Sequence, residues 1–189
     1  MSILERQIFD LLMKTMRQPA RIHSKLSFGL VLLITSVWAP LASAQHGLSL
    51  SANAGSSTDI TINFDDINGF DYITDAEILF NAGSSPSVMT FGSCYIMYSA
   101  STNSFYLAND ASNGWLGPVS SDGSVQNSQC ALSSTGTVAS GSPLTLSITV
   151  RVNFSVSFVG THYVFTSSTG SNGFTGFQNA GTHRWRGPA

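Results

Sequence analysis

Lysine is almost missing from this chain of 189 residues, and none occurs after position 25. Five of the eight basic residues lie in the first 25 positions, and the other three are Arg151, Arg184 and Arg186. A surface that binds nucleic acid or an anionic membrane needs clustered lysine and arginine to neutralise phosphate groups. The composition therefore argues against nucleic acids and charged membranes as partners.

Long apolar runs are also scarce, and the longest occupies residues 26–41, after the basic residues Arg17, Arg21 and Lys25. It is followed by the small-x-small sequence of residues 42–44, a pattern that signal peptidase accepts. We therefore expect residues 1–44 to be a cleaved signal peptide, with Met16 as an alternative start. Residues 45–189 should then form one domain that is secreted or displayed at the cell surface.

A membrane anchor is the alternative interpretation of this apolar segment. Its uninterrupted part, residues 26–38, is shorter than the about 20 apolar residues that a spanning helix needs. The cleavage pattern also follows it directly, so we expect no membrane span in residues 45–189. This part of the chain holds three arginines against eight carboxylates, a net charge of −5.

Cysteine is rare, and both copies, Cys94 and Cys130, lie in the exported part. In an oxidising compartment two cysteines have only one intramolecular pairing, so a Cys94–Cys130 disulfide is expected. Two free buried thiols or a metal-binding pair are the alternatives. No histidine stands at zinc-ligand spacing from either cysteine.

Helical periodicity is missing from residues 45–189, where short alternating runs are separated by Gly, Ser, Asn and Asp. The clearest alternation is residues 144–152; other strand-like runs are 60–64, 73–80, 94–98, 105–107, 130–132, 154–158 and 163–165. Some eight short strands predict an all-β, antiparallel, two-sheet sandwich. The glycine-rich end, residues 167–189, is expected either to add a closing edge strand near residues 181–186 or to be an unstructured tail.

Three stretches carry a resemblance to a known class of modules: NSFYLAND at 103–110, WLGP at 115–118 and NSQC at 127–130. Together with Cys94-Tyr95, they resemble immunoglobulin-like or fibronectin-III-like β-sandwich modules of secreted and surface proteins from acidobacteria and related soil bacteria. The resemblance implies an immunoglobulin-like sandwich and export, with a binding or spacer role and no catalytic residues. The sequence GTHRW at 181–185 departs from the more apolar closing strand of these modules, which puts the last strand in doubt.

Four carboxylates between the first two predicted strands form a candidate metal site: Asp65, Asp66, Asp71 and Asp75. Carboxylates and amide oxygens are hard ligands that suit calcium. The spacing does not match an EF-hand, because no glutamate closes the loop. The alternative is an ordinary acidic turn, in which Asp, Asn and Gly provide turn geometry. Calcium is the only cofactor that the sequence suggests.

A candidate ligand site consists of Asn109, Asp110 and Trp115. A loop tryptophan can stack on a sugar ring while neighbouring polar groups bind hydroxyls. The alternative, which we favour from the sequence, is that Trp115 folds over the core next to the disulfide. Three tyrosines at positions 95, 98 and 106 are expected either to form a solvent-facing row or to pair within the sheet.

No recognisable enzyme motif occurs in the chain. His46, His162 and His183 stand in no catalytic pattern, and His162 is expected to be solvated at the start of a strand; a nucleophile elbow is also missing. We therefore expect a non-catalytic binding or structural module whose partner is an extracellular glycan or protein. Two narrower alternatives are a carbohydrate-binding domain that uses loop aromatics and an adhesin or assembly subunit that pairs through edge strands.

Overall fold

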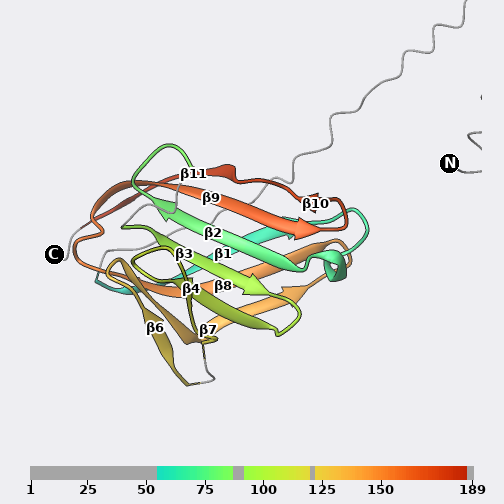
Figure 1. The fold of residues 1–189 in the computed structure, drawn as a ribbon, viewed down its shortest axis with the longest axis horizontal. Helices are drawn as coiled ribbons and strands as arrows, with labels where there is room; N and C mark the ends of the chain where they lie inside the picture. Colours follow the sequence, from blue (N-terminus) through green and yellow to red (C-terminus); the bar gives the residue numbers. More distant parts are fainter. Residues whose placement is uncertain (1–54, 87–91, 120–121, 187–189) are drawn as a thin grey trace, which may run out of the picture. The chain divides into compact units, whose positions relative to one another are not determined.

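The computed structural model describes residues 55–86, 92–119 and 122–186 (Figure 1). The predicted signal peptide and its cleavage site lie outside these residues. Within them, no helix has the length and apolar character needed to cross a membrane.

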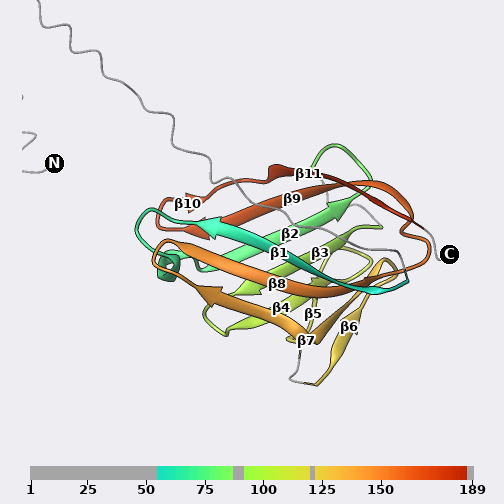
Figure 2. The same ribbon diagram turned by 180° about the vertical axis from the view of Figure 1, so that it is seen from behind.

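Two antiparallel sheets make up the fold, as the alternating runs predicted (Figures 1 and 2). The small sheet has the order β1-β8-β7-β6, and the large sheet has the order β10-β9-β2-β3-β4-β5, with β11 also paired to β9. A short 3-10 helix, η1 (Phe70–Tyr72), follows β1. The strands of the small sheet are β1 (Ser57–Asp65), β6 (Ser124–Gln126), β7 (Cys130–Gly141) and β8 (Thr145–Phe154). Those of the large sheet are β2 (Asp75–Asn81), β3 (Cys94–Ser99), β4 (Ser104–Ala108), β5 (Trp115–Leu116), β9 (Gly160–Gly170), β10 (Gly173–Phe174) and β11 (Gln178–Trp185).

The core lies between the inner faces of the two sheets. Strands β1 and β8 alternate strictly between buried and less buried residues, because successive side chains of a strand point to opposite faces. Their register places Ile62 opposite Ile148 and Phe64 opposite Leu146. Fully burying one such side chain stabilises the fold by about 1.5–3 kcal/mol. The small sheet therefore has one buried face, which the sequence pattern predicted.

The predicted disulfide between Cys94 and Cys130 is confirmed. Cys94 lies on β3 of the large sheet and Cys130 on β7 of the small sheet, and both side chains are buried in the core. The bond therefore connects the two sheets directly, across 36 residues of sequence.

The last strand, which the sequence left in doubt, is well defined. Strand β11 pairs with β9 from Gln178 to Trp185, with an irregularity between Asn179 and Gly181. Trp185 is only 1% exposed, and its ring lies 4.6 Å from Phe154 and 5.5 Å from Phe158, measured between centroids. The unstructured-tail alternative is wrong, because the buried side chain of Trp185 fixes this otherwise polar segment to the core.

His162 is not solvated, contrary to the expectation from its place near the start of β9. It is 7% exposed, and its ring stacks on Phe158 at 3.8 Å between centroids. The register of β9 and β11 places it opposite His183. Burial is the main cause that lowers the pKa of His162, although a backbone hydrogen bond with Gly160 opposes this shift.

Removal of the disulfide should destabilise the protein strongly. In the chain-entropy model, opening a loop of this size costs about 4 kcal/mol of the free energy of unfolding. We expect urea unfolding of the double variant Cys94→Ala/Cys130→Ala to show this loss, and the reduced wild-type protein to show a similar one. Protein that reacts with two equivalents of thiol reagent, when unfolded without reductant, would contradict the bond.

The stability should also fall in mild acid because of His162. A histidine with a folded pKa below its ordinary value of 6.5 binds more protons when unfolded, so its contribution is complete above pH 6.5 and is lost as the pH falls below it. Urea midpoints between pH 7 and pH 5 test this. The variant His162→Phe keeps a ring on Phe158 and should lose the dependence that His162 causes; an unchanged profile would contradict this assignment.

Candidate functional site

The large sheet is apolar on its outer face as well as on its inner face. On the side away from the core, Leu79, Tyr95, Ala108 and Phe165 form a second cluster, against which Tyr163 and Phe177 pack. Strand β2 reflects this in its sequence, because it carries the apolar run Ile78-Leu79-Phe80, and its last four residues are all buried. A strand that is covered on both faces has a continuous apolar run in place of an alternation.

The residues of this second cluster form a row across the sheet. Leu79 pairs with Phe165 on one side and with Tyr95 on the other, and Ala108 pairs with Trp115 further along. The ring of Tyr95 lies 5.0 Å from that of Trp115 and 5.9 Å from that of Phe177, measured between centroids. We call Tyr95, Trp115, Phe165, Phe174 and Phe177 the outer aromatic face.

Exposure divides the outer aromatic face into a support and a surface. Tyr95 and Phe165 are 6% and 2% exposed, whereas Trp115 is 40% exposed and Phe174 is 59% exposed. Phe177 lies between Tyr95 and Phe174, with ring centroids 6.3 Å from the latter. The exposed ring of Trp115 therefore rests on the buried ring of Tyr95, whereas Phe174 contacts the partly buried Phe177.

Glu77 fixes the orientation of Tyr95. Burial raises the pKa of the Tyr95 hydroxyl well above its usual range, and the Glu77 carboxylate, with which it is hydrogen-bonded, adds to this shift. The hydroxyl therefore remains protonated and donates to Glu77, which also accepts a hydrogen bond from Ser167 Oγ. This polar contact holds the supporting ring in place beneath Trp115.

Asn109 and Asp110, the predicted polar partners of Trp115, build the turn that carries it. Asn109 Nδ2 donates a hydrogen bond to Asn113 Oδ1 at 2.9 Å, and the backbone N of Asn113 donates one to Asn109 Oδ1 at 3.2 Å. Asp110 Oδ1 accepts hydrogen bonds from the backbone N of Ser128 at 2.8 Å and from its hydroxyl at 2.5 Å. These bonds lower the pKa of Asp110, which is therefore a structural carboxylate.

The position of Trp115 corrects the interpretation that we favoured from the sequence. Trp115 does not lie over the core next to the disulfide: it contacts Tyr95, whose side chain points away from the side on which Cys94 is buried. A two-residue strand, β5, holds it at the edge of the large sheet. Its outward direction follows from its pairing with Ala108, which belongs to the outer cluster.

The three tyrosines do not form one row. Tyr98 faces the core, where its ring lies 5.0 Å from that of Phe105. Tyr95 faces outward. It lies at position i and Tyr98 at position i+3 of the same strand, and residues at odd offsets along a strand point to opposite faces. The signal was available in the sequence, since a row on one face requires even spacing.

The four aspartates of the candidate calcium site do not share a ligand set. Asp66 is buried and accepts bonds from the backbone N of Asn68 and from the backbone N and hydroxyl of Ser171. Of the others, Asp65 accepts from Thr145 Oγ1, Asp75 accepts from Thr74 Oγ1, and Asp71 lies in η1. Within the part of the chain that the structure describes, no three His, Cys, Asp or Glu side chains are grouped to hold a metal.

Asp66 instead serves as an anchor between two loops. Desolvation is the largest single effect and raises the pKa of Asp66, but the hydrogen bonds from Asn68 and Ser171 together bring it below its ordinary value. A Cβ atom added at Gly170 would collide with an Asp66 oxygen, so the carboxylate is packed closely against this glycine. Calcium binding remains a prediction to which this geometry adds no support.

Comparison with known proteins yields no relative: no protein-family model, curated protein or solved structure matches this chain significantly.

The two layers of the outer aromatic face should differ in their effect on stability. Tyr95→Ala removes a buried ring together with its bond to Glu77 and should cost about 3 kcal/mol in the free energy of unfolding. Trp115→Ala removes a half-exposed ring and should cost about 1 kcal/mol. Chemical denaturation measures both values; an equally large loss for Trp115→Ala would show that Trp115 is itself a structural residue.

Proposed function

We propose that this protein is an exported, non-catalytic binding module of the cell surface or extracellular space, and that its outer aromatic face binds a glycan. The observation that carries the proposal is the exposed ring of Trp115, backed by the buried ring of Tyr95 at 5.0 Å. An aromatic face that is held in place can stack on the apolar face of a sugar without a large loss of conformational entropy.

The charge of the chain supports a neutral ligand. With three arginines against eight carboxylates in residues 45–189, acidic partners gain little from electrostatic attraction. Among the described residues the one salt bridge joins Arg151 and Asp59, on the small sheet and away from the outer aromatic face. Recognition would therefore depend on stacking and hydrogen bonds.

Membership of an immunoglobulin-like or fibronectin-III-like bacterial class is part of this proposal. Two antiparallel sheets joined by a disulfide support it. The pairing of β1 with β8 counts against a close relationship, because the first two strands of an immunoglobulin domain are neighbours in one sheet. The role as a binding module rests on the outer aromatic face and does not depend on this membership.

Trp115→Ala should weaken glycan binding about tenfold or more, because one stacking contact of this kind is worth about 1.4 kcal/mol. A glycan array with the exported protein, followed by titration calorimetry on the best ligand, measures the effect. Tyr72→Ala is the matched control, since Tyr72 is a 54% exposed aromatic residue in η1. Binding should be equal with calcium and with chelator.

Two results would contradict the proposal. The first is an array without any specific signal in either condition, and the second is equal loss of binding in Trp115→Ala and Tyr72→Ala. Binding that vanishes with chelator would instead support the calcium site of the four aspartates.

A further inference from the structure

A second exposed ring of the outer aromatic face lies at the opposite edge of the large sheet from Trp115. Phe174, which is 59% exposed, belongs to β10, whereas Trp115 belongs to β5, and these strands are the first and the last of the sheet (Figure 2). Phe174 pairs with Thr169, which shares a face with Phe165 because an even number of positions separates them on β9. Trp115 pairs with Ala108 of the same outer cluster. Both exposed rings therefore lie on one side of the sheet.

Hydrogen bonds fix the segment that carries Phe174 and Phe177 to β9. The backbone N of Thr175 donates to Ser168 O at 2.9 Å, and the backbone N of Ser168 donates to Thr175 Oγ1 at 3.0 Å. Phe177 packs against the outer cluster, with its ring centroid 5.9 Å from that of Tyr95. The position of Phe174 therefore depends on backbone bonds as well as on its ring contact with Phe177.

Four rings of the outer aromatic face form a row across the strands. The ring centroid of Phe177 lies 6.3 Å from that of Phe174 and 5.9 Å from that of Tyr95. The next step, from Tyr95 to Trp115, is 5.0 Å. Each step is close to the length that one pyranose unit adds to a linear chain. The backbones of β10 and β5 are five strand spacings apart, or about 24 Å. A ligand that contacts both exposed rings must therefore be an extended chain, because a disaccharide covers only one of them.

The rings are inclined to one another, which argues against a flat ligand. The ring planes of Phe174 and Phe177 are 87° apart, and those of Tyr95 and Trp115 are 54° apart. Two perpendicular rings cannot both stack on one plane, so the surface of a crystalline polysaccharide does not fit this row. A single chain whose sugar units turn relative to one another can present a ring face to each side chain in turn.

The charge around the row favours a neutral chain. Residues 111–119 and 173–179, which carry the exposed rings, contain no charged side chain. Arg184 of β11 pairs with Thr161 at the start of β9, whereas β10 pairs with the end of β9. An anionic polysaccharide thus gains no ion pair from the two segments that carry the rings, and a neutral one loses nothing by their lack of charge.

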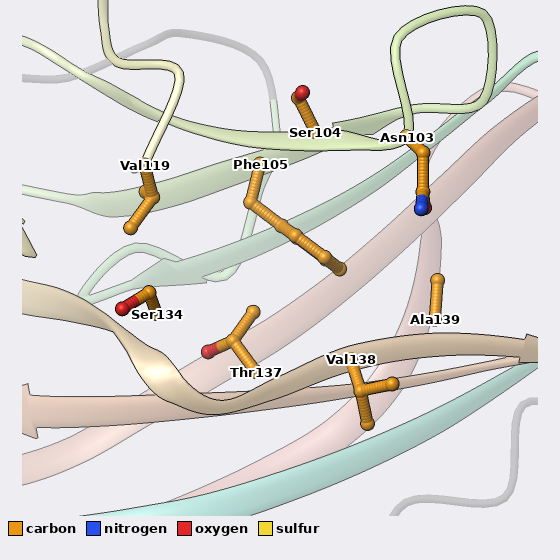
Figure 3. A pocket seen from close by; sticks show the side chains of 8 residues that line it. All are labelled: Asn103, Ser104, Phe105, Val119, Ser134, Thr137, Val138 and Ala139. Carbon is orange, nitrogen blue, oxygen red and sulfur yellow. The ribbon is translucent and has the colours of Figure 1, made fainter. Parts of the chain in front are cut away.

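A cavity between β4 and β7 lies on the other side of the large sheet (Figure 3). Its volume is about 240 Å³, below the about 300–1,000 Å³ of pockets that enclose a small molecule. Phe105, which lines it, belongs to the core and so faces away from the outer aromatic face. A sugar chain that stacks on Trp115 therefore binds to the open face of the sheet and does not enter this cavity.

We propose that the outer aromatic face binds one soluble, neutral polysaccharide chain that runs across the strands from Trp115 to Phe174. The inference rests on the proposed function and adds the length, the form and the direction of the ligand. Trp115, supported by Tyr95, provides the first stacking contact, and Phe174 provides a second one at the other edge of the sheet. Two contacts on one chain act together, so the affinity rises with chain length until both edges are reached.

The dependence of affinity on chain length tests the proposal. Titration calorimetry on the exported protein compares cello-, laminari- and malto-oligosaccharides from disaccharide to octasaccharide, together with the oligomers of any other neutral chain that binds on the glycan array. We expect the longest oligomer of a binding series to bind about tenfold more tightly than its disaccharide, because it gains a second stacking contact. Microcrystalline cellulose and chitin, which present flat surfaces, should not retain the protein.

Two variants assign the contacts. Phe174→Ala should remove most of the gain with chain length and leave disaccharide binding within about twofold of wild type, whereas Trp115→Ala should weaken both. Phe174→Tyr is the matched control, because it keeps an aromatic ring at this position and should keep the gain. Equal urea midpoints of the two Phe174 variants show that the loss in Phe174→Ala is not a loss of fold.

Several results would overturn this inference and leave the proposed glycan-binding function standing. They are an affinity that does not rise beyond the disaccharide, a gain with length that persists unchanged in Phe174→Ala, and retention on the crystalline polysaccharides that Trp115→Ala abolishes. A glycan array without any specific signal would instead overturn the proposed function, and this inference with it. The two failures are therefore distinguishable.

Discussion

The contact between the inner faces of the two sheets is the interaction on which the rest of this structure depends. Ile and Val residues of β1 and β8 meet the inward residues of β2, β3 and β9, and the disulfide between Cys94 and Cys130 connects the layers through this contact. Trp185 closes one end of the core and holds β11 on β9. Because β11 follows the loop that contains Phe177, the same packing also places that ring over Tyr95.

The two sheets differ in how their second faces are used. The small sheet presents polar side chains outward, among them Thr61 and Thr149, whose hydroxyls are 2.8 Å apart, and the Asp59–Arg151 pair. The large sheet presents aromatic side chains that are only partly covered. The proposed glycan site depends on this difference between the two sheets, because the exposed ring of Trp115 lies on the large sheet.

Most of the fold was predictable from the sequence, and particular residues show where prediction ended. The alternation in residues 144–152 indicated β8 because a strand with one wet face repeats every two residues. The environment of His162 could not be predicted in this way, since its burial depends on Phe158 and on Trp185, which comes 23 positions later in the chain. For the same reason the acidic cluster looked like a metal site: besides the nearby Asn68 N, the donors to Asp66 come from Ser171, more than a hundred residues away.

By itself, the sequence determined the all-β class, the antiparallel strands and the pairing of the only two cysteines. These properties depend on local alternation and on counting, neither of which requires knowledge of which strands are neighbours. The direction of Trp115, the burial of His162 and Trp185, and the cavity between β4 and β7 were decided only by the tertiary structure. Each of them depends on contacts between segments that are distant in the chain, and a period of two says which residues share a face but not what lies opposite that face.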